Sequence, residues 1–353
     1  MKRIGNLYDR ICSLENLQLA DEIARKGKLK NYGVLVHDKN REANILKLRE
    51  QLLNGTYHTS TYDVFTIYEP KERLIYRLPY YPDRIVHHAV MNVLEPIWLS
   101  VFTTDTFSCI KNRGIHAAAE RVKTILRKDP TGTAFCLKID IRKFYPSIKH
   151  DVLKQIIRRK LKDIRLLHLL DEIIDSAEGV PIGNYLSQYF ANLYLAYFDH
   201  WIKEVKKVKH YFRYADDMVF FASDKDSLHL LLDDINEYMG VLKIEVKKNW
   251  QIFPVDSRGI DFLGFVFFHT HTRMRKSIKQ TFCREIARLN HRKKPVPEGY
   301  FKQSIYPWWG WAKYCDSKHL INKLSKISKH EINFKRKAGH PSKFGGRKLA
   351  LQF

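Results

Sequence analysis

The chain has 353 residues, of which 44% are hydrophobic and 13% aromatic, so it is globular rather than disordered and long enough for two or three domains. Lys and Arg number 62 against 38 acidic residues, a net charge of +24, and +17 of this excess lies in residues 271–353, where 21 residues are basic and 4 acidic. This concentration indicates a nucleic-acid partner and argues against a membrane, because no amphipathic lipid-facing stretch accompanies it.

The five cysteines are odd in number and widely spaced, and no two stand at metal-ligand spacing. This pattern argues against a zinc site or a disulfide framework and favours a reducing cytoplasm. The N-terminus lacks a long apolar segment, so we expect no signal peptide. No run approaches the roughly 18 apolar residues that a membrane span needs.

Hydrophobic periodicity predicts the elements in chain order. Residues 6–55 read as largely helical up to Asn54-Gly55, and the next elements are strands at 64–68 and 73–76 and helices at 83–100 and 115–128. A strand at 135–141 then precedes helices at 150–160 and 185–205. After a hairpin at 211–221 we expect a helix at 226–239, strands at 242–246, 250–255 and 260–268, and basic helices broken near Pro295, Pro297 and Pro307. The order predicts an α+β fold with an antiparallel central sheet.

The stretch 211–221 is the most informative part of the sequence, because Asp216 and Asp217 stand between two β-prone runs. This pattern predicts a hairpin with two acids at its tip. Asp140 ends another apolar strand, so two strands would bring carboxylates to one point, as two-metal phosphoryl transfer requires. A solvated turn explains an isolated Asp-Asp pair, but these flanks are too hydrophobic for an ordinary turn.

The order of these pieces resembles the palm of reverse transcriptases over about residues 60–270. The matching series is an acid-bearing strand, a glycine-entered helix, a Tyr-x-Asp-Asp hairpin, a lysine-bearing strand and an aromatic-Leu-Gly strand. The resemblance implies a right-hand polymerase with fingers, an antiparallel-sheet palm and a helical thumb. It divides the chain into N-terminal helices and fingers at 1–105, a palm with some finger elements at 106–272, and a basic helical thumb at 273–353.

The resemblance implies an RNA-directed DNA polymerase, a nucleotidyltransferase that uses template RNA, a DNA primer and deoxynucleoside triphosphates. Asp140 and Asp216 would ligate two Mg²⁺ ions, with Mn²⁺ as an alternative metal. The backbone carbonyl of Ile141 would be a further ligand. Asp217 is the second acid of the family's pair and is less central to metal binding.

The family's nucleotide-binding residues match several positions here. Tyr145 stands where an aromatic ring excludes the ribose 2′-hydroxyl, although it could instead be a core aromatic beside Phe144. Four cations match residues near the triphosphate or the template, and a solvated basic face remains the alternative for each of them: Lys71, Arg73, Arg77 and Arg113. Lys248 aligns with a palm lysine that protonates the pyrophosphate, and Lys247 fits that role equally well.

Contacts to primer and template are implied at three places. Tyr214 belongs to the hairpin motif, and Phe262, Leu263 and Gly264 resemble the strand that grips the primer end, although the phenylalanine could be core. The thumb stretch interleaves aromatic rings with a basic charge, a pattern suited to stacking on nucleic acid: Trp308, Trp309, Trp311 and Lys313. A tryptophan-rich helix interface explains the same rings.

The segment 180–188 departs from the common reverse transcriptase pattern. Most members have Gln before the glycine and Pro after the serine, whereas this chain has Ile182 before Gly183 and Gln188 after Ser187. Gly183 would allow close backbone approach to the nascent pair. This version is similar to that of diversity-generating retroelement enzymes, as are Gly114–Ala118 and Trp308–Cys315.

That family makes adenine-mutagenic cDNA from a template-repeat RNA, and the cDNA replaces a variable region of a target gene. It usually acts with a small, basic, oligomeric accessory variability protein. The alternatives are a retron, phage-defence or group II intron-like bacterial reverse transcriptase. An alternative of another class is a non-catalytic RNA-binding protein with a relict palm. The intact Asp140, Asp216 and Asp217 argue against this alternative.

Overall fold

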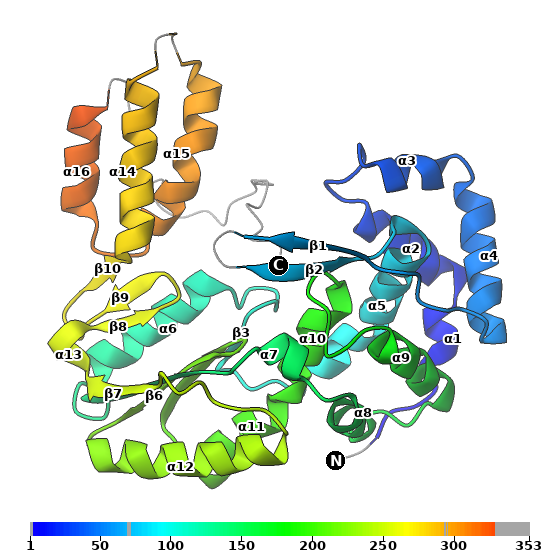
Figure 1. Cartoon of the computed structure of the whole chain (residues 1–353), viewed down its shortest axis with the longest axis horizontal. Helices are drawn as coiled ribbons and strands as arrows, with labels where there is room; N and C mark the ends of the chain where they lie inside the picture. Colours follow the sequence, from blue (N-terminus) through cyan, green and yellow to red (C-terminus); the bar gives the residue numbers. More distant parts are fainter. Residues whose placement is uncertain (1–2, 69–71, 293, 295, 329–353) are drawn as a thin grey trace.

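The computed structural model describes residues 3–68, 72–292, 294 and 296–328. Helices dominate the N-terminal part, a sheet with flanking helices forms the middle, and three helices stand together at the C-terminal end (Figure 1). In the described residues the strands form sheets of two, five and three strands, in the orders β1-β2, β3-β5-β6-β4-β7 and β10-β9-β8. Every pairing is antiparallel except that of the two-residue β3 with β5, so the α+β prediction is confirmed.

The N-terminal part confirms the predicted helices, strand pair and following helix. Ser13 caps the second helix by accepting a hydrogen bond from the Asn16 amide, and Gly55 ends the fourth in the left-handed conformation (φ +67°). The elements are α1 (Tyr8–Ile11), α2 (Leu14–Ala24), α3 (Tyr32–Asp38), α4 (Arg41–Asn54), β1 (Asp63–Ile67), β2 (Arg73–Arg77), η1 (Tyr80–Arg84) and α5 (Ile85–Leu99).

The middle part holds the central sheet and the helices around it. Its first elements are β3 (Thr106–Phe107), α6 (Ile115–Lys128), β4 (Phe135–Asp140), α7 (Phe144–Ser147), α8 (His150–Arg158), α9 (Ile164–Asp175), α10 (Tyr185–Tyr194), α11 (Ala196–His200) and η2 (Trp201–Val205). The hairpin β5 (His210–Tyr214) and β6 (Asp217–Ala222) follows, then α12 (Lys225–Val241), β7 (Gln251–Pro254) and α13 (Val255–Arg258). The predicted helix at 185–205 therefore exists in three consecutive pieces.

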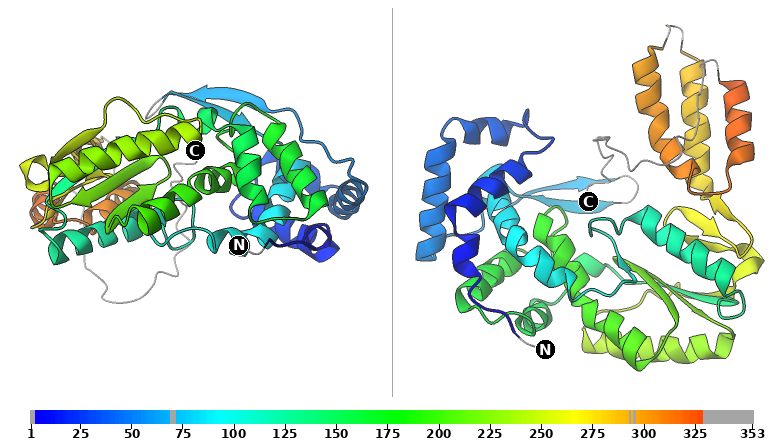
Figure 2. Two further views of the ribbon diagram at one scale, coloured as in Figure 1. Left: turned by 90° about the horizontal axis from the view of Figure 1, so that it is seen from below. Right: turned by 180° about the vertical axis from the view of Figure 1, so that it is seen from behind.

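Alternation along β4 and β6 gives the sheet two buried faces. Leu137 and Ile139 of β4 join the core that includes α12, whereas Cys136 and, from β6, Val219 and Phe221 face the core that includes α6 and residues 260–267. Helix α12 lies along the sheet as a separate layer (Figure 2). Strands covered on both faces are mostly apolar, which fits the position of the acids at the strand ends; Lys138 of β4 is half-buried.

Two strand predictions are wrong. Residues 242–246 form no strand, because Lys243 adopts the left-handed conformation (φ +57°) and only Val246 makes a bridge, to Ile141. Residues 260–268 form a hairpin instead of one strand, β8 (Ile260–Phe262) and β9 (Phe265–Phe267). Its two turn residues, Leu263 and Gly264, both have positive φ, as tight hairpin turns require. A further strand, β10 (Thr272–Met274), pairs with β9.

The C-terminal part consists of α14 (Lys276–Asn290), α15 (Glu298–Ala312) and α16 (Lys318–Ile327), packed on their own apolar cluster. The expected break between the first two helices is confirmed, but Pro307 lies inside α15 without ending it, so the break predicted there is wrong. None of the helices in the described residues combines the length and the apolarity required to cross a membrane.

Candidate active site

The Asp216–Asp217 hairpin and the end of β4 meet at one edge of the central sheet. In the antiparallel register Asp140 faces Asp217, and Asp217 faces Tyr214. Only Ala215 and Asp216 join β5 to β6, and Ala215 has φ +54°. A non-glycine residue in this conformation costs about 1–2 kcal/mol, so the surrounding contacts must hold the turn in place.

Two lysines contact the acids, one from β4 and one from the segment between α12 and β7. Lys247 Nζ lies 2.6 Å from Asp140 Oδ2, and the Lys247 amide donates to the Asp140 carbonyl at 2.8 Å. Lys138 Nζ lies 3.8 Å from Asp217 Oδ1 and also donates to the Asp261 carbonyl. Lys138 stands two residues before Asp140 on the same face of β4, so the alternation of the strand could have identified it beforehand.

The environment of the hairpin acids disfavours their charged forms. Burial, together with the negative charge of Asp140, raises the pKa of Asp216 to about 6. Burial also raises the pKa of Asp217 to about 7, although the Lys138 ammonium opposes the shift. Strongly raised carboxylate pKa values are typical of functional sites.

The donor set at this edge fits a hard divalent cation. Oδ1 of Asp140 and Oδ1 of Asp217 are buried without a hydrogen-bond partner, an expensive state for a carboxylate oxygen. The bridge between Ile141 and Val246 uses the Asp140 carbonyl and the Arg142 amide, not the Ile141 carbonyl. Within the described residues, no three Asp, Glu, His or Cys side chains already surround one point, and Lys247 holds one Asp140 oxygen instead.

The residues expected to bind the nucleotide lie at different distances from this edge. Arg73 and Tyr145 are close to Asp216: its negative charge acts on the pKa of both, although burial is the main cause in each, lowering that of Arg73 and raising that of Tyr145. Arg77 is exposed and pairs with Asp63 on the facing strand. Arg113 donates from Nη1 to the Thr103 carbonyl at 2.8 Å. Lys71 lies outside the described residues.

The segment before α10 packs directly on the fingers strand β2. The Tyr76 amide donates to the Ile182 carbonyl at 2.8 Å. Gly183 has φ +125°, and a Cβ added there would lie well inside van der Waals distance of the Tyr76 carbonyl oxygen. This glycine therefore allows a close approach of the segment to the chain's own β2. Ile182 and Gln188 are half-buried.

The β8–β9 turn contacts the thumb rather than standing free. Phe262 is fully buried in the core beneath the sheet and Leu263 is nearly so. A Cβ on Gly264 would come within 2.5 Å of the Trp311 ring, which also lies 5.3 Å from the Phe265 ring. Phe262 is thus a core aromatic. Trp311 packs between α15 and the β8–β9 turn, as expected for a tryptophan in a helix interface.

The remaining predicted contacts lie around this interface. Trp308 and Trp309 are half-buried against the thumb core, and the Lys313 ammonium lies 5.5 Å from the Tyr314 ring centre. Tyr214 packs against the core between α6 and the β8–β9 hairpin. Lys248 is exposed next to Lys247, and it is Lys247 that contacts Asp140.

A cavity of about 560 Å³ adjoins the acids on the side of the β8–β9 hairpin. Asp140 and Asp217 line it together with Lys138, Arg258 and Arg275. Arg275 Nε lies 2.6 Å from Asp261 Oδ1, which ties the first residue after β10 to the hairpin. No sequence signal marked Arg258 and Arg275, because one ends α13 and the other precedes α14, and only the tertiary structure brings them to the acids.

The chain is similar to several known proteins. The chain is 25% identical to the protein YkfC of Escherichia coli, in a match that covers 64% of this chain and 71% of YkfC. It is also 25% identical to the group II intron-encoded protein LtrA of Lactococcus lactis, over 47% of this chain but only 29% of LtrA. The structure is similar to that of apo telomerase from Candida tropicalis with a TM-score of 0.49 and 14% identity, covering 78% of this chain and 60% of that one.

The model of one family matches residues 69–267, more than half of the chain and the whole span that contains the acids, the hairpin and the β8–β9 turn. The family is described as reverse transcriptase (RNA-dependent DNA polymerase). The chain belongs to this family, and it is a reverse transcriptase.

Proposed function

We propose that this reverse transcriptase extends a DNA primer on an RNA template through an active site formed by Asp140, Asp216 and Asp217. The observation that supports this most is the register of β4 and β6, which sets Asp140 opposite Asp217 with two buried carboxylate oxygens unpartnered. Two Mg²⁺ ions, or Mn²⁺ in their place, would supply activation of the primer 3′-hydroxyl and neutralisation of the triphosphate. Asp140 and Asp216 would hold them, with the Ile141 carbonyl as a further ligand.

The neighbouring side chains have complementary roles in this proposal. Lys247, 2.6 Å from Asp140, is placed to donate a proton to the departing pyrophosphate. Arg73 stabilises the charge of the triphosphate, and Tyr145, close to both Arg73 and Asp216, limits the space beside the ribose. Residues 1–105, 106–272 and 273–353 act as fingers, palm and thumb.

Primer extension tests the proposal against a non-catalytic RNA-binding role. Purified protein is given an annealed RNA template, a DNA primer, deoxynucleotides and Mg²⁺. We expect extension by the parent and by Asp233→Asn, an exposed acid on α12, and a loss of on the order of a thousandfold or more for Asp216→Asn. Equal extension by Asp216→Asn and the parent would exclude the assigned site.

We also propose the more specific role of a mutagenic enzyme of the diversity-generating retroelement type. The support is Ile182 at the position where most members have a polar Gln, in a loop held against the fingers strand by the Tyr76 amide. An apolar side chain there cannot make a polar check on the incoming nucleotide. The template would be a repeat RNA, and the partner a basic oligomeric accessory protein in the cytoplasm.

An intron-type reverse transcriptase is the second candidate, because one relative is named a group II intron-encoded protein. The cDNA error spectrum separates the two. A mutagenic enzyme misincorporates opposite template adenines, and Ile182→Gln lowers that error rate while most polymerisation remains. Ile164→Gln, at an exposed isoleucine on α9, is the matched control. Accurate copying of adenines by the parent would favour the intron type, and an unchanged spectrum in Ile182→Gln would refute the role of Ile182.

A further inference from the structure

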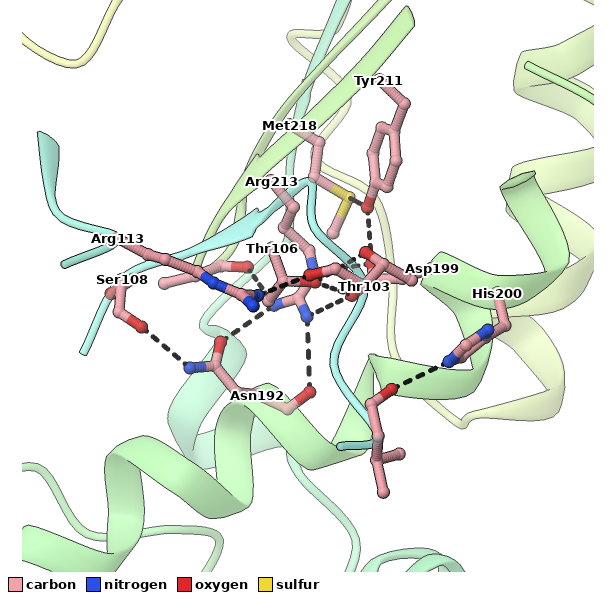
Figure 3. Close-up of polar contacts among 12 residues, drawn as sticks. Thr103, Thr106, Ser108, Arg113, Asn192, Asp199, His200, Tyr211, Arg213 and Met218 are labelled. Atoms are coloured by element: carbon pink, nitrogen blue, oxygen red, sulfur yellow. Dashed lines mark hydrogen bonds and ion pairs between the residues drawn. The ribbon is translucent and has the colours of Figure 1, made fainter. Parts of the chain in front are cut away.

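A completely buried arginine lies directly beneath the catalytic turn. Arg213 of β5 is 0% exposed, and each of its five N–H groups has an acceptor. Nε and Nη2 donate to Asp199 at 2.8 and 2.5 Å, and Nη1 and Nη2 donate to Asn192 Oδ1 and its carbonyl at 3.1 and 3.4 Å. The fifth N–H, on Nη1, donates to the carbonyl of Ala215 at 3.1 Å. Figure 3 shows these groups converging from β5, α10 and α11.

The carboxylate of Asp199, which pairs with Arg213, also has a full set of hydrogen bonds. Besides Arg213, Asp199 of α11 accepts from Tyr211 Oη at 2.8 Å and from Thr106 Oγ1 at 2.7 Å, so each oxygen receives two hydrogen bonds. Asp199 is also fully buried. The network therefore joins α11, β3 and β5, and it extends to the turn between β5 and β6.

Stability alone does not explain a pair of this kind. Burying two charges costs several kcal/mol each in desolvation, and well-packed apolar residues often serve stability as well or better. What the planar guanidinium adds is fixed direction, since its donors form a rigid fork. One arm of that fork holds Ala215, the residue that adopts the left-handed conformation immediately before Asp216.

Arg213 is also linked, through Asn192, to the loop at residues 108–109. Oδ1 of Asn192 accepts from Arg213, and its Nδ2 donates to the Ser108 carbonyl at 3.0 Å. Ser108 and Cys109 both have positive φ (+87° and +56°). The same buried network therefore fixes two backbone segments that the local sequence does not favour.

We propose that Arg213, oriented by Asp199, is a positioning residue that holds the Ala215–Asp216 turn in its catalytic geometry. The inference rests on the proposed catalytic role of Asp216. Arg213 does not touch substrate; it acts by limiting how far the turn can move, and a displacement of about 1 Å at such a site costs on the order of a hundredfold in rate.

Arg213→Lys is the sharpest test, because it keeps the charge but supplies only three donors from one nitrogen, too few to hold Asp199, Asn192 and Ala215 together. We expect kcat for primer extension to fall by about tenfold or more. The affinity for primer–template and the KM for deoxynucleotide change much less. In metal-free protein, hydrogen–deuterium exchange of the peptide spanning 214–218 becomes faster.

Thr106→Val and Tyr211→Phe are the controls, because each removes one hydrogen bond to Asp199 and leaves the bond from Arg213 to Ala215. Thr106→Val is the cleaner of the two, since the Tyr211 hydroxyl also lies 3.7 Å from Met218 Sδ. They should lower the melting temperature while leaving kcat and the exchange of 214–218 close to those of the parent. If Arg213→Lys does not fold, the double variant Arg213→Met with Asp199→Leu removes both charges and should show the same two effects.

Unchanged kcat and exchange in the folded Arg213 variants would overturn the inference. So would an equal loss of kcat in Thr106→Val, because the network would then contribute only stability. Asp216→Asn, assayed in parallel, separates this failure from failure of the proposed function: if that variant still extends primers, it is the active-site assignment that is wrong.

Discussion

Lys247 places its ammonium nitrogen 2.6 Å from Oδ2 of Asp140, and the backbones of the two residues are also hydrogen-bonded. The lysine therefore neutralises one carboxylate oxygen of the site while Oδ1 of the same side chain remains buried and unpartnered. A cation bound to Oδ1 would share this carboxylate with the Lys247 ammonium, which places the lysine at the site.

We predict that Lys247→Ala lowers kcat for nucleotide addition by about 100-fold, the scale of general acid catalysis, because the pyrophosphate then leaves without a placed proton donor. Lys248→Ala is the matched control, since Lys248 is exposed and next in sequence. Single-turnover primer extension across pH measures both. Comparable losses in the two variants, or a larger loss in Lys248→Ala, would contradict the assignment and favour Lys248.

The acids should make the metal-free protein less stable as pH rises. The folded-state pKa values of Asp216 and Asp217, about 6 and about 7, lie above the unfolded value of 3.8. Between about pH 4 and 7 the folded state therefore binds more protons than the unfolded state, and the free energy of unfolding falls as pH increases.

Removing one of these acids should restore part of the stability that the metal-free protein loses at high pH. Asp217→Asn, measured with a chelator present, should be more stable than the parent at pH 8 by on the order of 1 kcal/mol, a figure reduced because the side chain is 32% exposed. At pH 4 the two should melt alike. Asp233→Asn is the control, and a stability difference that does not change with pH would refute the cause given.

Gly183 should tolerate no side chain. Gly183→Ala places a Cβ against the Tyr76 carbonyl and requires φ +125°, so we expect a loss of several kcal/mol in stability or a displaced fingers strand with reduced extension. Gly240→Ala, in the last turn of α12 with open space around it, should be neutral or stabilising by up to about 0.5–1 kcal/mol. Thermal melts and extension assays of both variants test this, and equal behaviour would disprove the contact.

Trp311 should matter as a joint between thumb and palm. Its ring lies against Gly264 and Phe265, so Trp311→Ala leaves a gap there and should cost about 3 kcal/mol in stability and shorten the products made per binding event. Tyr306→Ala, at a 49% exposed ring on the same helix, should change stability by less than about 0.5 kcal/mol. A stability loss in Tyr306→Ala as large as that in Trp311→Ala would argue against a specific joint.

The active-site elements were predictable because their signals are local. The runs that carry Asp140 and Asp216–Asp217 are short, apolar and rich in aromatic and β-branched residues, as buried strands are. The helices at 115–128 and 226–239 have continuous helical periodicity. Short strands at 260–274 were not predictable in the same way. Leu263 is an apolar residue at a position with positive φ, so its turn has no sequence signal beyond Gly264.

The sequence by itself determined which residues can do the chemistry: three acids at strand ends, a basic C-terminal region and the motif order of a reverse transcriptase. Only the tertiary structure decided which lysine reaches Asp140, that Gly183 and Trp311 pack against the protein's own backbone and rings, and that Arg213 lies beneath the turn. The physical reason is that these contacts join residues far apart in the sequence. Periodicity reports each segment's own preference, whereas the pairing of a buried charge depends on strands and helices that meet only after folding.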